Sequence, residues 1–302
     1  MHKPKIIAIV GPTASGKSAL GIFLAQKLRR LPAGRQGEII SADSRQVYKG
    51  LDIGTGKVTK KEMAGISHHL LDVASPKKVF TVDDFIKKAS ATITTIYGSG
   101  HTPIIVGGTG LYIDALLGRI SIPSVPPNEE LRTQLEKKSA TTLLKILQRL
   151  DPERAETVDQ KNPRRLVRAI EIARAIGKTP PKKIEEKYEI LWLGLNPSDQ
   201  VLKKNIHTRL LVRMKLGMVA EAKRLHAQGL SYKRMRELGL EYRYLAMYLQ
   251  DTLTRGDFEI QLERAIWHYA KRQRTWFKRN QEIHWIKNKT EALRLAKGFL
   301  SR

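Results

Sequence analysis

Residues 11–18 constrain the fold more than any other segment of the chain. They read Gly-Pro-Thr-Ala-Ser-Gly-Lys-Ser, with an apolar run at Ile6–Val10 before them and a helical pattern at Ala19–Leu28 after them. Such a loop between a buried strand and a helix is typical of phosphate binding, because its backbone N–H groups can turn towards phosphate oxygens. We therefore expect an α/β fold of the P-loop type that binds a di- or triphosphate.

All eight loop residues are predicted to contribute to this diphosphate or nucleotide site. Lys17 adds a positive charge, and the hydroxyl of Ser18 is suited to ligate Mg²⁺. The alternative, a glycine-rich turn without a ligand, is disfavoured by the strand and the helix on either side. The loop consists of Gly11, Pro12, Thr13, Ala14, Ser15, Gly16, Lys17 and Ser18.

Strand and helix patterns alternate over the N-terminal part of the chain. Buried strands are predicted at Glu38–Ala42 and Pro103–Val106, and a helix is predicted at Phe85–Tyr97. This alternation indicates a doubly wound parallel sheet, whose ligand site lies beyond the carboxyl ends of the strands. Residues 29–37 are rich in Gly, Pro and Arg, and we expect an exposed loop or a local insertion there.

The pattern changes near residue 118, where several prolines interrupt it. Helical patterns follow until Gly177, and a strand at Glu189–Leu195 leads back towards the sheet. We interpret residues 119–187 as an inserted helical lobe, and residues 1–118 and 188–302 as the core with a mainly helical C-terminal region. The helices expected in the lobe span Glu129–Lys138, Thr141–Leu150 and Asn162–Ile176.

The charge balance of the chain is strongly basic. Lys and Arg total 55 and Asp and Glu total 29, which gives a net charge of +26. This excess favours a polyanionic partner, although a basic solvated surface explains it equally well. The absence of cysteine excludes disulfides, thiolate zinc sites and cysteine nucleophiles. No stretch approaches the roughly 20 apolar residues of a membrane span, and we expect a cytoplasmic protein without a membrane partner.

Asp43 follows the second predicted strand directly. In a parallel sheet this position places its carboxylate at the rim of the crevice that contains Lys17. The carboxylate could hold Mg²⁺ or accept a proton from a nucleophile, and it could equally cap a helix. A nucleotide hydrolase would usually end another strand with a carboxylate for Mg²⁺, whereas the strand at Pro103–Val106 ends in glycines, which disfavours that class and leaves a kinase open.

Seven segments together resemble the bacterial tRNA dimethylallyltransferases, also called isopentenyl-diphosphate:tRNA transferases. Each segment alone is modestly specific, but their common order along nearly the whole chain is very specific. The segments are residues 11–18, 40–48, 51–57, 68–72, 106–112, 162–168 and 270–277.

The resemblance implies a reaction between a tRNA and dimethylallyl diphosphate. The exocyclic N6 of the adenosine that is 3′-adjacent to the anticodon attacks the first carbon of the donor, and diphosphate leaves. The phosphate loop then holds this diphosphate with Mg²⁺ rather than a nucleotide. The adenosine must be flipped out of its stack, which suits an unpaired nucleotide of the anticodon stem-loop. We expect the enzyme to act as a monomer.

The resemblance also implies roles for individual residues. Asp43 accepts the proton of the amine, Thr109 shapes the channel in which base and isoprenoid meet, and Arg209 stabilises the leaving diphosphate. The residues after Asp43, namely Ser44, Arg45 and Gln46, are implied to contact the tRNA together with it.

Basic segments elsewhere are predicted to contact the tRNA. At helical spacing Lys271, Arg274 and Lys278 share one face, while Trp276 and Phe277 can pack inward. A solvated amphipathic helix is the alternative, and the family resemblance favours RNA. The full set in this helix is Lys271, Arg272, Gln273, Arg274, Thr275, Trp276, Phe277 and Lys278; in the lobe it is Arg132, Arg164, Arg165, Leu166, Val167 and Arg168.

One segment departs from the family pattern. The family carries Gly-Tyr-Arg or Gly-Tyr-Lys, whereas here two residues separate Gly239 from Tyr242. Which of Arg236, Tyr242 and Arg243 contacts RNA therefore stays open.

Several other residues invite interpretation. His68 and His69 lack a metal-ligating neighbour in the sequence and favour a structural or channel role. Trp192 and Trp285 are predicted to pack in the core.

Two other functions are compatible with parts of this sequence. A small-molecule or nucleoside kinase would use the same phosphate loop, but it would not need the net charge of +26. A non-catalytic RNA-binding protein would need the basic segments but not Lys17, Ser18 and Asp43.

Overall fold

The computed structural model describes residues 3–28, 36–178 and 186–301. The chain divides into two compact units, one of residues 118–185 and the other of residues 1–117 and 186–302. The smaller unit covers most of the segment in which the sequence predicts an inserted lobe, residues 119–187. Of the loop or insertion predicted at 29–37, residues 29–35 lie outside the described part of the chain, and Gly37 begins a strand.

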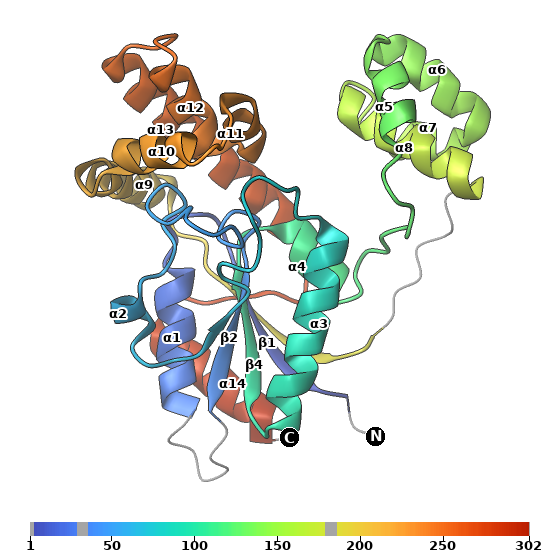
Figure 1. The fold of residues 1–302 in the computed structure, drawn as a ribbon. Helices are drawn as coiled ribbons and strands as arrows, with labels where there is room; N and C mark the ends of the chain where they lie inside the picture. The colour runs from blue at the N-terminus through green and yellow to red at the C-terminus, as the bar shows by residue number, and fades with distance from the viewer. Residues whose placement is uncertain (1–2, 29–35, 179–185, 302) are drawn as a thin grey trace. The chain divides into compact units, whose positions relative to one another are not determined.

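The larger unit is built around a six-stranded sheet in which neighbouring strands are parallel (Figure 1). The order of the strands is β3-β2-β4-β1-β5-β6. The four strands predicted from the sequence are confirmed, and the two short strands at the edges are added to them. The strands span Lys5–Val10 (β1), Gly37–Ala42 (β2), His68–His69 (β3), Thr102–Gly107 (β4), Glu189–Gly194 (β5) and His284–Trp285 (β6).

Helices cover both faces of the sheet, as expected of a doubly wound fold. The helices α1 and α14 lie on one face of the sheet, and α3 and α4 lie on the other (Figure 1). Successive residues of β1 point to opposite faces, so Ile7 and Ile9 pack on the side of α1 and α14, whereas Ile6 and Ala8 pack on the side of α3 and α4. Burial on both faces explains why the central strands are continuous apolar runs. The helices span Lys17–Leu28 (α1), Lys60–Met63 (α2), Val82–Gly98 (α3), Gly110–Leu116 (α4) and Lys289–Ser301 (α14).

A second layer of helices lies beyond the carboxyl ends of the strands (Figure 1). Its apolar core also takes in Ala14 of the phosphate loop and Val47, Tyr48 and Leu51 of the chain after β2. This helical layer therefore packs directly onto the loops that follow the strands. Its helices span Asp199–Lys215 (α9), Met218–Ala227 (α10), Tyr232–Leu238 (α11), Leu240–Leu249 (α12) and Arg255–Phe277 (α13).

Within residues 118–178, the regular structure of the smaller unit is helical, and the unit has an apolar core of its own. The three predicted helices are present, and the sequence prediction missed the short helix α7. Asp151 caps that helix and proline occupies its first turn, so its start carried a recognisable signal. The helices span Glu129–Glu136 (α5), Ala140–Leu150 (α6), Pro152–Thr157 (α7) and Pro163–Ile176 (α8).

The two tryptophans predicted to lie in the core behave differently. Trp192 on β5 is 1% exposed, which confirms its prediction. Trp285 is 37% exposed, and the prediction for it was wrong, because it lies on the edge strand β6 and covers Gly194 with only one side of its ring.

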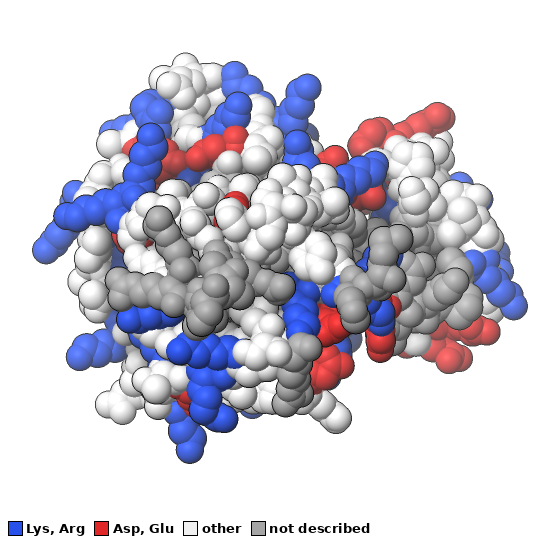
Figure 2. All heavy atoms as spheres, turned by 90° about the horizontal axis from the view of Figure 1, so that it is seen from below, with Lys and Arg blue, Asp and Glu red and all other residues white. Residues whose placement is uncertain are grey.

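The distribution of basic side chains and the hydropathy of the helices can be compared with the expectations from the sequence. On the face seen in Figure 2, Lys and Arg side chains are spread over the surface rather than gathered in one patch. Within the described residues, no helix is both long and apolar enough to cross a membrane.

Candidate active site

The carboxyl ends of three adjacent strands bring the predicted site residues together. Val10 at the end of β1 and Ala42 at the end of β2 both pair with Gly107 at the end of β4. The phosphate loop, Asp43 and Thr109 follow these three strand ends. They therefore meet at one edge of the sheet, as the parallel topology requires.

The phosphate loop needs glycine at its first position. Gly11 has φ +144°, and a Cβ on it would lie 2.3 Å from the carbonyl oxygen of Leu195. Ala14 in the same loop adopts φ +60°, the left-handed region that disfavours residues with a side chain. The loop is thus held in a conformation that surrounding contacts must stabilise.

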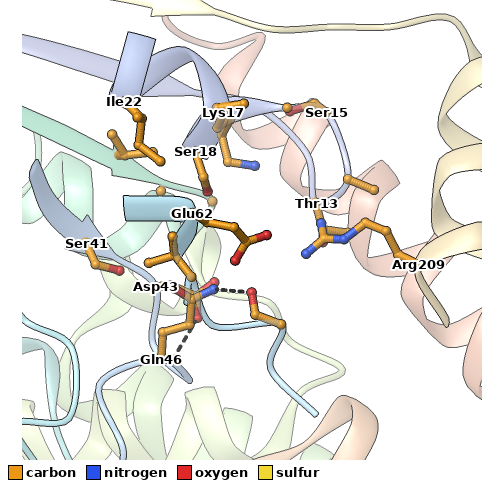
Figure 3. Close-up of a pocket in the computed structure, with 18 of the residues that line it drawn as sticks. Thr13, Ser15, Lys17, Ser18, Ile22, Ser41, Asp43, Gln46, Glu62 and Arg209 are labelled. Carbon is orange, nitrogen blue, oxygen red and sulfur yellow. Dashed lines mark hydrogen bonds between the residues drawn. The ribbon is translucent and has the colours of Figure 1, made fainter. Parts of the chain in front are cut away.

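The loop borders a pocket of about 880 Å³. Lys17, Glu62, Asp43 and Arg209 point towards its centre from different elements (Figure 3). Further lining residues come from the phosphate loop, β4, α9 and α13. Among them are Thr13, Ser18, Gly108, Asn205, Tyr269 and Gln273.

The Asp43 carboxylate stabilises a turn and also lines the pocket. Its Oδ1 accepts hydrogen bonds from the backbone N–H groups of Arg45 at 2.8 Å and Gln46 at 3.3 Å. The capping alternative therefore applies to a turn of residues 44–47 rather than to a helix. Because one oxygen holds the turn, the same carboxylate keeps a fixed position on the wall of the pocket.

Lys17 is half-buried, and Arg209 and Asp43 act on its charge in opposite directions. Burial, and next the Arg209 guanidinium, lower the pKa of the Lys17 ammonium to about 7, while the Asp43 carboxylate acts in the opposite direction. The ammonium donates a hydrogen bond to the carbonyl oxygen of Pro12. A bound polyanion would favour the charged form of Lys17 again.

Thr109 connects the strand end of β4 to the turn that carries Asp43. Its Oγ1 accepts a hydrogen bond from the backbone N–H of Ser44 at 3.0 Å and also bonds to the hydroxyl of Tyr269. Burial, and next the Asp43 carboxylate, raise the pKa of Tyr269 to about 12, while the bond to Thr109 acts the other way. The Tyr269 hydroxyl therefore stays protonated within the pocket.

Helix α13 is joined to the site by its inner face. The Gln273 side chain accepts a hydrogen bond from the N–H of Thr13 at 2.7 Å and donates one to the carbonyl oxygen of Gly108 at 2.8 Å. Trp276 donates to Asp114 at 2.8 Å, and its ring lies against Gly110. These contacts explain the glycines after β4, because a Cβ on Gly108 or Gly110 would lie 2.2 Å from these side chains.

The structure corrects the predicted RNA contacts on α13. Gln273 and Phe277 are buried, Trp276 is half-buried, and all three face the interior, so the outer surface of α13 does not present them to RNA. Gln273 lines the pocket instead. Arg274 forms an ion pair with Asp199 and donates to the Pro197 carbonyl oxygen. The residues of the predicted set that are exposed are Lys271, Arg272, Thr275 and Lys278.

Several predicted contacts in the smaller unit are also internal. Leu166 and Val167 are buried in its apolar core. Arg132 and Arg168 both form ion pairs with Glu171, whose side chain is 2% exposed. Arg164 and Arg165 are exposed, and Arg165 also forms an ion pair with Asp159.

In the segment that departs from the family pattern, the structure separates the buried tyrosine from the two exposed arginines. Tyr242 is 1% exposed, and its hydroxyl donates to Glu221, so this tyrosine belongs to the core and not to an RNA surface. Arg236 and Arg243 are exposed. Glu221 also accepts the backbone N–H groups of residues 52–54, which fixes the loop beneath Arg209.

The two histidines of β3 make structural contacts. His69 and His101 both bond to the Glu38 carboxylate, and His68 bonds to the carbonyl oxygen of Ile66. Among the described residues, no group of three or more His, Cys, Asp or Glu side chains is placed to hold a metal ion.

The sequence analysis did not name Glu62, Asn205 and Tyr269, which line the pocket, and it did not predict that Gln273 faces inward. Tyr269 and Gln273 are four residues apart, which is the spacing of one helix face, so their common orientation was recoverable. Nothing in the local sequence places Glu62 or Asn205 beside the phosphate loop.

The parallel sheet, the loop after β1 and the pocket at the strand ends define a P-loop protein of the doubly wound α/β class. Residues 46–280 match the family model described as IPP transferase. The chain belongs to this family.

Individual relatives extend the match over nearly the whole chain. The chain is 39% identical over 299 residues to tRNA dimethylallyltransferase 1 of Geotalea uraniireducens, covering 98% of this chain and 96% of that protein. A crystal structure of the full-length tRNA isopentenylpyrophosphate transferase of Bacillus halodurans superposes with a TM-score of 0.73 at 33% identity, covering 99% and 97% of the two chains. A eukaryotic dimethylallyltransferase acting on tRNA gives a TM-score of 0.75 at 26% identity, covering 91% and 70%.

Proposed function

We propose that this chain is a tRNA dimethylallyltransferase. It transfers the dimethylallyl group of dimethylallyl diphosphate to N6 of the adenosine 3′-adjacent to the anticodon and releases diphosphate. The observation that carries the proposal is that Lys17, Asp43 and Arg209 line one pocket. The family membership and the names of the relatives support the same activity.

The pocket offers the groups that this displacement needs. The N6 nitrogen forms a bond to the first carbon of the donor while the bond from that carbon to the diphosphate oxygen breaks. Asp43 accepts the proton that the nitrogen loses. Lys17, Arg209 and the amides of the phosphate loop neutralise the charge that develops on the departing diphosphate.

The residues of the pocket fit a magnesium ion bound together with the diphosphate. Ser18 presents a hydroxyl to the pocket, and the carboxylates of Asp43 and Glu62 line it too. Oxygen ligands of this kind suit Mg²⁺, which commonly uses one or two protein groups and substrate phosphates. The bound ion would supply additional positive charge at the leaving group.

The tRNA would meet the enzyme on exposed basic residues near this pocket. Lys271, Arg272 and Lys278 are exposed on α13, the helix whose inner face holds the site. An unpaired anticodon-loop adenosine can be turned out of its stack into the pocket at modest energetic cost. We place the enzyme in the cytoplasm and expect it to act as a monomer.

Two labelled donors distinguish this proposal from a kinase. Purified protein and unmodified tRNA are incubated with Mg²⁺ and either dimethylallyl diphosphate labelled in its alkyl group or ATP labelled at the γ-phosphate. We expect label in the tRNA only from the dimethylallyl donor. Transfer from ATP alone would reject the proposal, and binding of tRNA without any transfer would favour an RNA-binding protein.

A further inference from the structure

Two amide side chains of the helical layer form hydrogen bonds to the backbone of the phosphate loop. Gln273 of α13 bonds to the N–H of Thr13 at 2.7 Å, and Asn205 of α9 donates to the carbonyl oxygen of Ala14 at 3.1 Å. Both helices belong to the larger unit and pack against each other. The two bonds therefore connect consecutive residues of the loop to two helices that pack against each other.

These hydrogen bonds lie next to the strained residue of the loop. Ala14 lies between these contacts and has φ +60°, a conformation that an alanine rarely adopts without support from its surroundings. Ala14 is also 8% exposed and packs in the apolar core of the same helical layer. The helical layer thus supplies the contacts that keep the loop in this shape.

The side chain at position 273 must be an amide to make both of its bonds. The Thr13 N–H needs an acceptor and the Gly108 carbonyl needs a donor, and one orientation of glutamine satisfies both. Glutamate could not donate, and an apolar residue could do neither. Since Gln273 is 6% exposed, water cannot readily replace the lost partners.

We propose that Gln273, with Asn205, is a positioning residue that holds the phosphate loop in its strained conformation and so sets its affinity for a diphosphate. We call Gln273 and Asn205 together the clamp. The ligand class rests on the proposed function, but the role of the clamp is independent of which group is transferred. On this account, loosening the clamp weakens binding of the diphosphate and leaves binding of tRNA unchanged.

The test measures the affinity of the full chain for inorganic diphosphate with Mg²⁺ by titration calorimetry. Gln273→Met keeps the side-chain volume and removes both hydrogen bonds, and we expect the dissociation constant to rise about tenfold. The Kd for tRNA should stay within about twofold, and the KM for the dimethylallyl donor should rise more than kcat falls. Ile96→Ala is the control, because Ile96 is buried on α3 in a different apolar cluster from the one that contains Ala14.

Two further variants separate a positioning role from general loss of stability. Gly108→Ala would place its Cβ 2.2 Å from the Gln273 amide nitrogen and should weaken diphosphate binding by displacing that amide. Combined with Gln273→Met it should add little, since both act through one contact. Ala14→Gly should restore part of the affinity of Gln273→Met, because glycine adopts φ +60° without steric strain.

An unchanged diphosphate Kd in Gln273→Met would overturn the proposal. So would equal losses of diphosphate affinity, tRNA affinity and melting temperature that match those of Ile96→Ala. A double variant that binds as weakly as the product of both single losses would also overturn it. Wild-type protein that binds diphosphate but transfers no dimethylallyl group would reject the proposed function and leave the clamp to be judged by these variants. Wild-type protein that binds no diphosphate would reject both.

Discussion

Asp43 does two things at once, and a substitution can separate them. Its Oδ1 holds the turn through Arg45 and Gln46, and an asparagine could still accept both bonds. Asparagine cannot take a proton from an amine, so Asp43→Asn should lower the single-turnover rate by about 10²–10⁴-fold while tRNA affinity stays near wild type. Normal turnover combined with a large loss of tRNA affinity would contradict the role of Asp43 as the base.

The low pKa of Lys17 predicts a pH dependence of diphosphate binding. In the free protein the pKa is about 7, because burial disfavours the charge. Bound diphosphate favours the charged form and raises this pKa, so binding takes up a proton above pH 7. The affinity for diphosphate should therefore fall as the pH rises above 7. Below pH 7, Lys17 is already charged in the free protein and adds no pH dependence to the affinity.

Calorimetry at pH 8 in buffers of different ionisation enthalpy measures that proton uptake directly. Lys17→Arg is the matched control, because arginine stays charged at this pH. The uptake due to Lys17 should be absent in the variant, and an equal uptake in both proteins would assign the proton to the ligand instead.

How far a residue's role could be predicted depends on whether the signal is local. The loop of residues 11–18 and the position of Asp43 follow from local spacing and strand topology, which the sequence contains. Tyr269 and Gln273 act on segments far away in the chain, and local spacing does not reveal that partner. Arg274 illustrates the same limit, since its position on a basic helix says nothing about Asp199, which pairs with it.

At the scale of elements, α13 has two chemically different faces. Its inner face ties down the phosphate loop and the segment after β4, and its outer face presents Lys271 and Lys278 to solvent. The amphipathic pattern predicts a helix with a buried and an exposed face, but not which of its motif residues point inward.

The outer face of α13 should contribute electrostatically to tRNA binding. Replacing Lys271 and Lys278 together by Ala should weaken tRNA binding and reduce the slope of log K against log salt by about 1 for each lysine. The measurement is a filter-binding titration at several salt concentrations. Lys297→Ala, on the exposed side of α14, should leave the slope unchanged, and the same slope in the double variant would mean that α13 is merely a solvated face.

For the whole molecule, the central strands of the sheet were predictable because strands that are buried on both faces leave continuous apolar runs in the sequence. The strands β3 and β6 have two residues each, which is too short for any periodicity, and this is also why the exposure of Trp285 was missed. The helical layer of α9 to α13 could be predicted as helices, but its packing onto the phosphate loop depends on long-range contacts such as that of Asn205.

The most direct test of the whole account locates the transferred group on the RNA. Unmodified tRNA is treated with the enzyme, Mg²⁺ and dimethylallyl diphosphate, and nuclease fragments and nucleosides are then analysed by mass spectrometry. We predict one added dimethylallyl group on N6 of the adenosine 3′-adjacent to the anticodon, and none with Asp43→Asn on the same time scale. A group attached to another nucleotide or atom, or equal modification by Asp43→Asn, would contradict a pocket in which Lys17 holds diphosphate and Asp43 receives the proton.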